Sequence, residues 1–264
     1  MGQFMKKKII HIFFSPTNAT KIIGKKIIDS FREYELREID LTKKIFSDID
    51  LDKDGIAIIG MPVYRSALPE VAIERLKKIK ASGIPAVIYI VYGNRGYGQA
   101  LQELKQSSYV RGFIPVAQGT YIGEHSFSTT EYPIAVNRPD KDDLEKAKMF
   151  GDLIKENIAY LESIEKISLD IVSIERKEPL RIPPGIDLKC NLCGKCIDMC
   201  PVRANDFVDN SLSTNKEKCI TCMACVKGCP NNARYIKSEQ LLNIAKQLFN
   251  ATQERKNPEY ELLV

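Results

Sequence analysis

The feature that most constrains this chain is a doubled cysteine motif between residues 190 and 230. Its first half reads Cys190-x2-Cys193-x2-Cys196-x3-Cys200-Pro201, and its second half reads Cys219-x2-Cys222-x2-Cys225-x3-Cys229-Pro230. Three thiolates spaced this way wrap one corner of a cuboidal [4Fe–4S] cluster. Zinc sites use pairs of Cys-x2-Cys, which would leave the third and fourth cysteines of each half without a role. The spacing therefore predicts two [4Fe–4S] clusters.

Residues 188–237 resemble the bacterial two-cluster ferredoxins. The resemblance implies crossed ligation, in which the fourth cysteine of each half serves the other cluster. One cluster would be held by Cys190, Cys193, Cys196 and Cys229, and the other by Cys219, Cys222, Cys225 and Cys200. All eight cysteines are then ligands and none remains for a disulfide, so we expect a cytoplasmic protein of an anaerobe.

Length and charge bound the remaining chain. A ferredoxin module takes the smaller share of 264 residues and leaves about 180 for a domain with its own core. The net charge of +5 comes from scattered basic residues, so neither nucleic acid nor a membrane partner is expected, and the longest apolar run has only the length of a strand. We expect a domain at 1–165, a linker at 166–187, the cluster domain at 188–237 and a C-terminal helix and tail at 238–264.

The chain begins with the pattern of an anion site. Residues 9–14 form an apolar run typical of a buried parallel strand, and His11 inside it is expected to be a core histidine. A hydroxyl-rich loop at residues 15–20 follows, and then a helix with apolar residues at four-residue steps. Hydroxyls and backbone N–H groups at a helix N-terminus bind anions. Alternatively, Ser15 or Thr17 merely caps that helix.

Four more strands are expected, at residues 35–40, 55–60, 85–91 and near 112–121. Helices are expected from Pro69 to about Lys80, around Leu101 and Leu104, and after an Asp140 cap. Strands alternating with helices predict an α/β fold with a doubly wound, five-stranded parallel sheet, beside the small α+β cluster domain. Such sheets bind their ligands at the carboxyl ends of the strands.

The loop at residues 15–20 resembles the flavodoxin phosphate loop. Ser15, Thr17 and Thr20 fall on its three hydroxyl positions, and Asn18 stands where glycine is usual. Asparagine tolerates left-handed backbone well, so the turn is retained. The resemblance implies the strand order 2-1-3-4-5 and FMN between strands one and three. The implied cofactor residues are Ser15, Thr17, Asn18, Ala19, Thr20, Pro62, Val63, Tyr64, Tyr92, Gly93, Asn94, Arg95, Tyr97 and Gly98.

Several aromatic and basic residues of these loops can be interpreted in two ways. Tyr64 and either Tyr92 or Tyr97 stack on the flavin, or they are ordinary surface tyrosines. Arg95 raises the flavin potential, or it is a solvated loop charge. His125, expected after the fifth strand, either faces the flavin as a proton donor or is a loop histidine bonded to backbone.

Residues 8–237 as a whole resemble the flavodoxin–ferredoxin fusion proteins of anaerobic bacteria and archaea. The resemblance implies an oxidoreductase that passes single electrons between two [4Fe–4S] clusters and FMN, which delivers them to an unknown acceptor. The alternative is a non-catalytic electron carrier or adaptor between redox proteins. Expected partners are a redox protein such as a ferredoxin, as donor or acceptor, with a small-molecule acceptor also open. The sequence holds no nucleophile motif and no glycine fingerprint for NAD(P).

Overall fold

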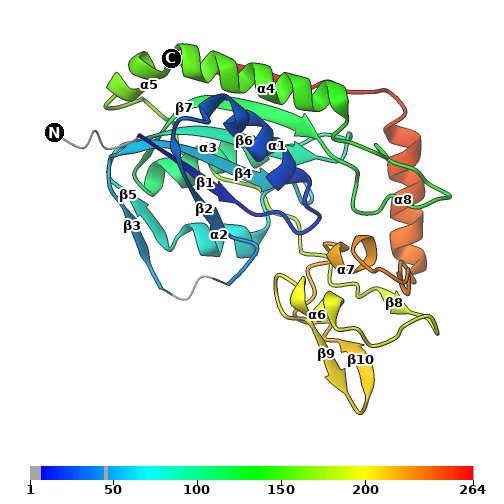
Figure 1. Ribbon diagram of the computed structural model, residues 1–264. Helices are drawn as coiled ribbons and strands as arrows, with labels where there is room; N and C mark the ends of the chain where they lie inside the picture. Colours follow the sequence, from blue (N-terminus) through cyan, green and yellow to red (C-terminus); the bar gives the residue numbers. More distant parts are fainter. Residues whose placement is uncertain (1–6, 45–46, 264) are drawn as a thin grey trace.

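The computed structural model describes residues 7–44 and 47–263. Its largest element is a six-stranded sheet in the order β12-β7-β6-β4-β1-β2 (Figure 1). Five strands run parallel, and they are β1 (Lys8–Phe13), β2 (Glu35–Asp40), β4 (Gly55–Pro62), β6 (Ile84–Tyr92) and β7 (Phe113–Ile122). Numbered along the chain, these five lie in the order 2-1-3-4-5, which is the flavodoxin-like order. The predicted fold class is therefore confirmed.

Helices cover both faces of the sheet, as its apolar strands require. One face packs against α1 (Ala19–Ile28), η1 (Asp29–Phe31), α4 (Lys141–Glu156) and α5 (Ile158–Ser163). The other packs against α2 (Glu70–Leu76) and α3 (Ala100–Val110). Strand β1 shows why both faces are apolar, because Ile10 and Ile12 enter one core and Ile9 enters the other. Asp140 caps α4 as predicted, accepting from the N–H groups of Asp142 and Asp143.

Two of the expected helices end earlier than predicted. The helix expected to reach about Lys80 stops at Leu76, and residues Ile79–Ala81 form β5, which pairs with β3 (Ile49–Leu51). Ile79 and Ala81 are buried with Lys80 exposed between them, the alternation of a half-buried strand. The long stripe after Asp140 divides at Asn157 into α4 and α5, and both parts still pack on the same core.

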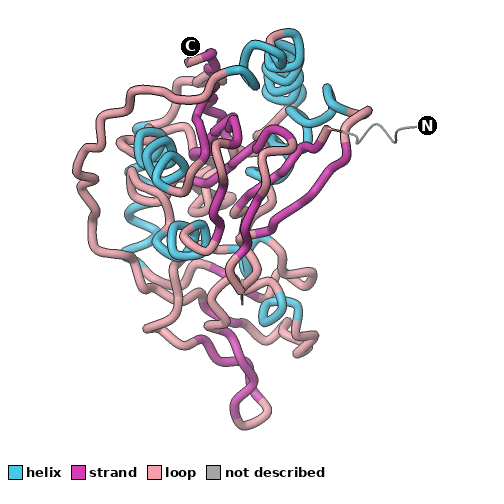
Figure 2. Tube along the Cα trace, turned by 90° about the vertical axis from the view of Figure 1, so that its left-hand side faces the viewer, coloured by secondary structure: helices cyan, strands magenta, loops and turns pink. Residues whose placement is uncertain are grey.

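The cysteine-rich part lies beside the sheet domain, below it in Figure 1. It contains β8 (Gly185–Ile186) paired with β11 (Arg234–Tyr235), and the helical turns α6 (Lys195–Asp198) and α7 (Ala224–Lys227). Its hairpin of β9 (Asn205–Val208) and β10 (Ser211–Thr214) projects at the opposite end of the molecule from the C-terminus (Figure 2). Residues 164–184, which lead into it, form neither helix nor strand.

Polar contacts hold the cysteine-rich part against the sheet domain. The Arg75 guanidinium donates to the carbonyls of Leu41 and Thr42 at 2.7 Å and to the carbonyl of Pro201 at 2.5 Å. Lys227 Nζ pairs with Glu124 and donates to the carbonyl of Ser128 at 3.0 Å. These contacts give the two parts a fixed relation.

The C-terminal segment returns to the sheet. Helix α8 (Glu239–Ala251) begins after Ser238, whose side chain accepts from the N–H of Leu241. Strand β12 (Glu259–Leu262) then pairs antiparallel with β7, a strand that the sequence analysis did not predict. Tyr260 and Leu262 pack on the core, while Glu259 and Glu261 are exposed. Within the described residues, no helix has the length and apolarity needed to cross a membrane.

Candidate functional site

A cavity of about 570 Å³ lies between the sheet domain and the cysteine-rich part. This is within the usual size of cofactor and small-molecule sites. It opens at the carboxyl ends of three neighbouring parallel strands, where a flavodoxin-like sheet binds its ligand. Predicted cofactor residues that line it are Thr17, Ala19 and Thr20 after β1, Pro62, Val63 and Tyr64 at the end of β4 and beyond, and Tyr92, Gly93 and Arg95 at the end of β6 and beyond. Five others do not line it: Ser15, Asn18, Asn94, Tyr97 and Gly98.

The loop before α1 has the geometry of an anion site. Asn18 is left-handed with φ of 70°, the conformation expected where the resembling loop has glycine. The Ser15 hydroxyl is engaged, because it accepts from the N–H of Lys21 at 3.0 Å. Thr17 and Thr20 instead face the cavity beside the N-terminus of α1. The loop therefore combines the two interpretations, with Ser15 bonding the helix backbone and the threonines lining the cavity.

Buried hydrogen bonds join this loop to β1 and β6. The Tyr89 hydroxyl donates to the Thr20 carbonyl at 3.0 Å and lies 3.1 Å from His11 Nε2. Both side chains are fully buried, and a β-carbon added at Gly24 would lie 2.2 Å from each of these polar atoms. His11 is thus a core histidine, as predicted, and it braces the start of α1.

Tyr64 lies on a tight turn at the cavity wall. Arg65 and Ser66 both have positive φ, 53° and 70°, and a two-residue β-bridge joins Tyr64 to Ala67. Burial raises the pKa of Tyr64 well above its ordinary value, and the nearby Cys222 adds to the shift. Its hydroxyl therefore stays protonated, and the residue lines the cavity.

Of the two residues predicted as the second aromatic partner, only Tyr92 lines the cavity. Tyr92 lines the cavity, and Tyr97 packs edge-on against it with ring centroids 5.4 Å apart. Tyr97 also contacts the core formed with α2 and α3. Gly98, with φ of 53°, packs closely on Ser66, where a β-carbon would lie 2.4 Å from the Ser66 β-carbon. Tyr97 and Gly98 thus contact Tyr92 and Ser66, two residues that line the cavity.

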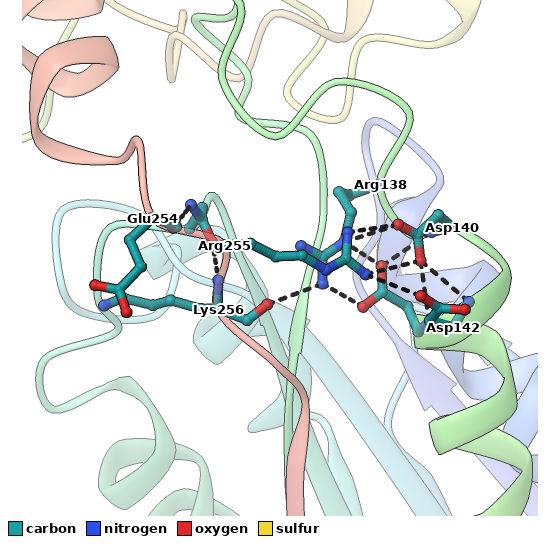
Figure 3. A network of polar contacts seen from close by, with 8 residues as sticks. Arg138, Asp140, Asp142, Glu254, Arg255 and Lys256 are labelled. Carbon is teal, nitrogen blue, oxygen red and sulfur yellow. Dashed lines mark hydrogen bonds and ion pairs between the residues drawn. The ribbon is translucent and has the colours of Figure 1, made fainter.

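Asn94 ties the loop after β6 to the C-terminal tail. Its side-chain amide donates to the carbonyls of Thr252 (3.0 Å) and Glu254 (2.8 Å), and its Oδ1 accepts from the N–H of Lys256 (3.1 Å). The tail continues into a network of ion pairs around Arg138 and Arg255 at the start of α4 (Figure 3). Arg255 pairs with Asp140 and Asp142, and the Arg138 guanidinium donates to the Lys256 carbonyl at 3.1 Å.

His125 combines features of both of its interpretations. Its Nδ1 accepts a hydrogen bond from the backbone N–H of Phe127 at 3.0 Å, and its ring lines the cavity over Gly93. Burial lowers its pKa to about 4, and the charges of Lys227 and Arg95 add to this shift. The ring is therefore neutral near pH 7, and because Nδ1 accepts, Nε2 carries the proton.

The cysteines surround two further, smaller cavities. Lining the outer cysteine cavity are Cys190, Cys193, Cys196 and Cys229, and lining the inner cysteine cavity are Cys200, Cys219, Cys222 and Cys225. These are the two sets that crossed ligation requires. Within the described chain, no three His, Cys, Asp or Glu side chains meet closely enough to hold a single metal ion. Four thiols around each cavity fit a cluster as the bound group.

Backbone donors complete these cysteine sites. The N–H groups of Ala204 and Ala233 donate to the Sγ atoms of Cys200 and Cys229, each at 3.2 Å. Hydrogen bonds to cluster sulfurs are one of the means by which proteins set a cluster's potential. The two cavities differ in exposure, because Cys193 in the outer set is exposed and Cys222 in the inner set is 9% exposed.

The large cavity and the inner cysteine cavity share a wall. Val202, Ile220 and Thr221 line both of them. Sequence reasoning missed these residues, and it also missed Arg176 from the connecting segment and Ile244 and Leu248 from α8. The sequence shows that α8 has an apolar stripe and that apolar residues lie near Cys219 and Cys200. No local sequence pattern, however, predicts that these residues line the large cavity.

Comparisons with known proteins gave matches to both parts of the chain. Residues 185–230 match the family described as 4Fe-4S dicluster domain. Among solved structures, an archaeal flavodoxin aligns with this chain at 15% identity and a TM-score of 0.39. The alignment includes 58% of this chain and 99% of the flavodoxin. Flavodoxin 2 from Bacillus cereus aligns at 17% identity and a TM-score of 0.42, and the alignment includes 57% of this chain and 99% of that protein. The flavodiiron protein from Giardia intestinalis shows 18% identity and a TM-score of 0.38, and 61% of this chain matches 38% of it.

No match was found among curated protein sequences. The structural likenesses are low, so the fold is assigned from the strand order. This chain joins a flavodoxin-like α/β fold to a 4Fe-4S dicluster domain, and the predicted combination of the two is confirmed.

Proposed function

We propose that this protein transfers electrons through two [4Fe–4S] clusters to one FMN. The observation that carries the proposal is the wall of Val202, Ile220 and Thr221, which separates the large cavity from the inner cysteine cavity. A cluster and a flavin in these two cavities would be neighbours within one chain. When bound, the clusters supply one-electron steps and FMN accepts either one or two electrons, so two clusters match one flavin.

The residues around the large cavity suit FMN. Thr17 and Thr20 would hold the phosphate at the N-terminus of α1, where N–H groups and the helix dipole favour an anion. Tyr64 and Tyr92 would contact the flat ring system, and Gly93 allows close approach because it has no side chain. Arg95 brings a positive charge to the same wall.

The cysteine cavities suggest the direction of electron flow. The outer set of Cys190, Cys193, Cys196 and Cys229 includes the exposed Cys193, whereas Cys219, Cys222 and Cys225 of the inner set are buried. Tyr64 lines the large cavity, and Cys222 of the inner set is near enough to add to the rise in the pKa of Tyr64. Electrons from an external redox protein would therefore enter at the outer cluster and leave through the inner one.

A second candidate function is catalysis on a small acceptor, and His125 favours it. The neutral ring holds its Nε2 proton by the bond that Nδ1 accepts from Phe127, and it lines the same cavity as the proposed flavin. It can donate a hydrogen bond there without carrying charge. If the protein acts only as a carrier, His125→Gln leaves electron delivery to a protein acceptor unchanged.

The proposal is tested by reconstituting the chain with iron, sulfide and FMN under anaerobic conditions. A reduced ferredoxin then serves as the electron donor, and flavin reduction is followed by absorbance in rapid mixing. We expect Cys222→Ser to slow flavin reduction strongly while FMN remains bound, because it removes the inner cluster. Cys193→Ser removes the outer cluster and provides the matched comparison. Flavin reduction at the wild-type rate in both variants contradicts the proposal.

A further inference from the structure

The two halves of the cysteine motif place different residues at one equivalent position. The fifth residue after the fourth cysteine is Asn205 in the first half and Arg234 in the second. Both are buried, at 4% and 3% exposure. They meet between the two cysteine cavities, where Arg234 Nη2 donates to Asn205 Oδ1 at 3.3 Å.

Arg234 lies beside both cysteine sets. Its Nη2 lies 3.7 Å from the Sγ atom of Cys225, which belongs to the inner set, while its side chain lines the outer cysteine cavity. Its remaining contact from Nη2 is to the Thr214 hydroxyl at 2.9 Å.

The guanidinium is otherwise unpaired within the described residues. Its Nε and Nη1 atoms are buried with no hydrogen-bond partner there, and no carboxylate forms an ion pair with it. A buried cation without a compensating anion is costly, and arginine stays charged in proteins. The protein groups around Arg234 therefore leave most of its charge uncompensated.

We propose that Arg234 is a shared counter-cation for both cluster sites. The inference rests on the proposed occupancy by two clusters, whose thiolate ligation gives each a negative charge. Reduction adds an electron to each cluster, and a fixed positive charge between them favours that step. Arg234 thus raises both reduction potentials together, which keeps the clusters matched as two one-electron donors for one flavin.

The test is a redox titration of the cluster-loaded, FMN-free chain, with each cluster followed by EPR. Arg234→Gln is expected to lower both midpoint potentials, with at least a tenfold change in each reduction equilibrium, or about 59 mV per electron. Arg234→Lys keeps the charge and is expected to restore most of that change. Arg203→Gln is the matched control, because Arg203 is an exposed arginine of the same part, and its expected change is below threefold.

A second variant covers the case in which Arg234→Gln does not retain its clusters. Asn205→Asp places a carboxylate beside Arg234, which neutralises the cation without removing it, and it is expected to lower both potentials similarly. Unchanged potentials in a cluster-loaded Arg234→Gln or Asn205→Asp chain overturn the role of Arg234 and leave the proposed function standing. A wild-type chain that does not assemble two clusters overturns both proposals.

Discussion

Asn94 gives the sharpest prediction about how the C-terminal tail supports the cavity. The side chain is 4% exposed and makes three hydrogen bonds, to the carbonyls of Thr252 and Glu254 and from the N–H of Lys256. At about 1 kcal/mol for each bond, their loss costs roughly 3 kcal/mol. Asn94 is also left-handed, with φ of 63°, where alanine costs about 1 kcal/mol more.

We therefore expect Asn94→Gly to destabilise the attachment of the tail by about 3 kcal/mol and Asn94→Ala by about 4 kcal/mol. The assay is amide hydrogen exchange at Leu263, whose N–H donates to the Val116 carbonyl beyond the site of substitution. A loss of 3 kcal/mol accelerates exchange by about two orders of magnitude if the tail detaches as a unit.

Gln253→Ala is the control, because it removes an amide from the same tail at an exposed position. We expect it to change the exchange rate by less than threefold. If Asn94→Gly leaves the Leu263 exchange rate within threefold of wild type, the tail is not held by Asn94 and the reasoning fails. A faster rate for Asn94→Gly than for Asn94→Ala would refute the contribution of the left-handed backbone.

Three further predictions follow from the site. Gly93→Ala puts a methyl group 2.2 Å from the ring of His125, so FMN affinity, measured by fluorescence titration, should fall at least tenfold. Because burial lowers the pKa of His125 to about 4, the unfolded chain binds a proton before the folded one as pH falls. The free energy of unfolding should therefore decrease from pH 6.5 downward, and His125→Gln should remove roughly 2 kcal/mol of that decrease, after discounting for solvent in the cavity. Crossed ligation predicts that Cys200→Ser loses the inner cluster and Cys229→Ser the outer one, and EPR of each variant would show the reverse if ligation followed the chain order.

The strands and the cysteine motif were predictable because each follows from a short-range pattern, whereas the strand order and the crossed cysteine sets were implied by resemblance to known families. Apolar runs such as residues 84–92 are buried along their whole length in β6, and the helical stripe after Asp140 identifies its core face. The spacing of the cysteines is itself a local sequence pattern, and the two sets of four cysteines line separate cavities.

The missed elements depend on contacts between distant segments. Ile79–Ala81 continues an amphipathic helical pattern, and only pairing with Ile49–Leu51 makes it a strand. Glu259–Leu262 alternates polar and apolar residues, but four residues are too few to indicate a strand until β7 offers an edge. The part that Asn94 plays in holding the tail spans more than 150 residues of chain, and no local pattern reports it.

The large cavity, too, was predictable only where its residues follow from local patterns. The loop residues at the carboxyl ends of β1, β4 and β6 were predictable, because parallel strands bring their ends to one edge. The wall formed by Val202, Ile220 and Thr221 was not, since it depends on how the cysteine-rich part docks through Arg75 and Lys227.

The most direct test of the proposed function is to measure electron transfer from the clusters to FMN within one chain. The clusters of FMN-free protein are reduced, the reductant is removed, and one equivalent of FMN is added anaerobically while flavin absorbance and cluster EPR are recorded. We predict that FMN binds and takes up two electrons as the reduced signals of both clusters disappear. FMN that binds but stays oxidised beside reduced clusters would contradict the proposal that this chain passes electrons from its clusters to a flavin.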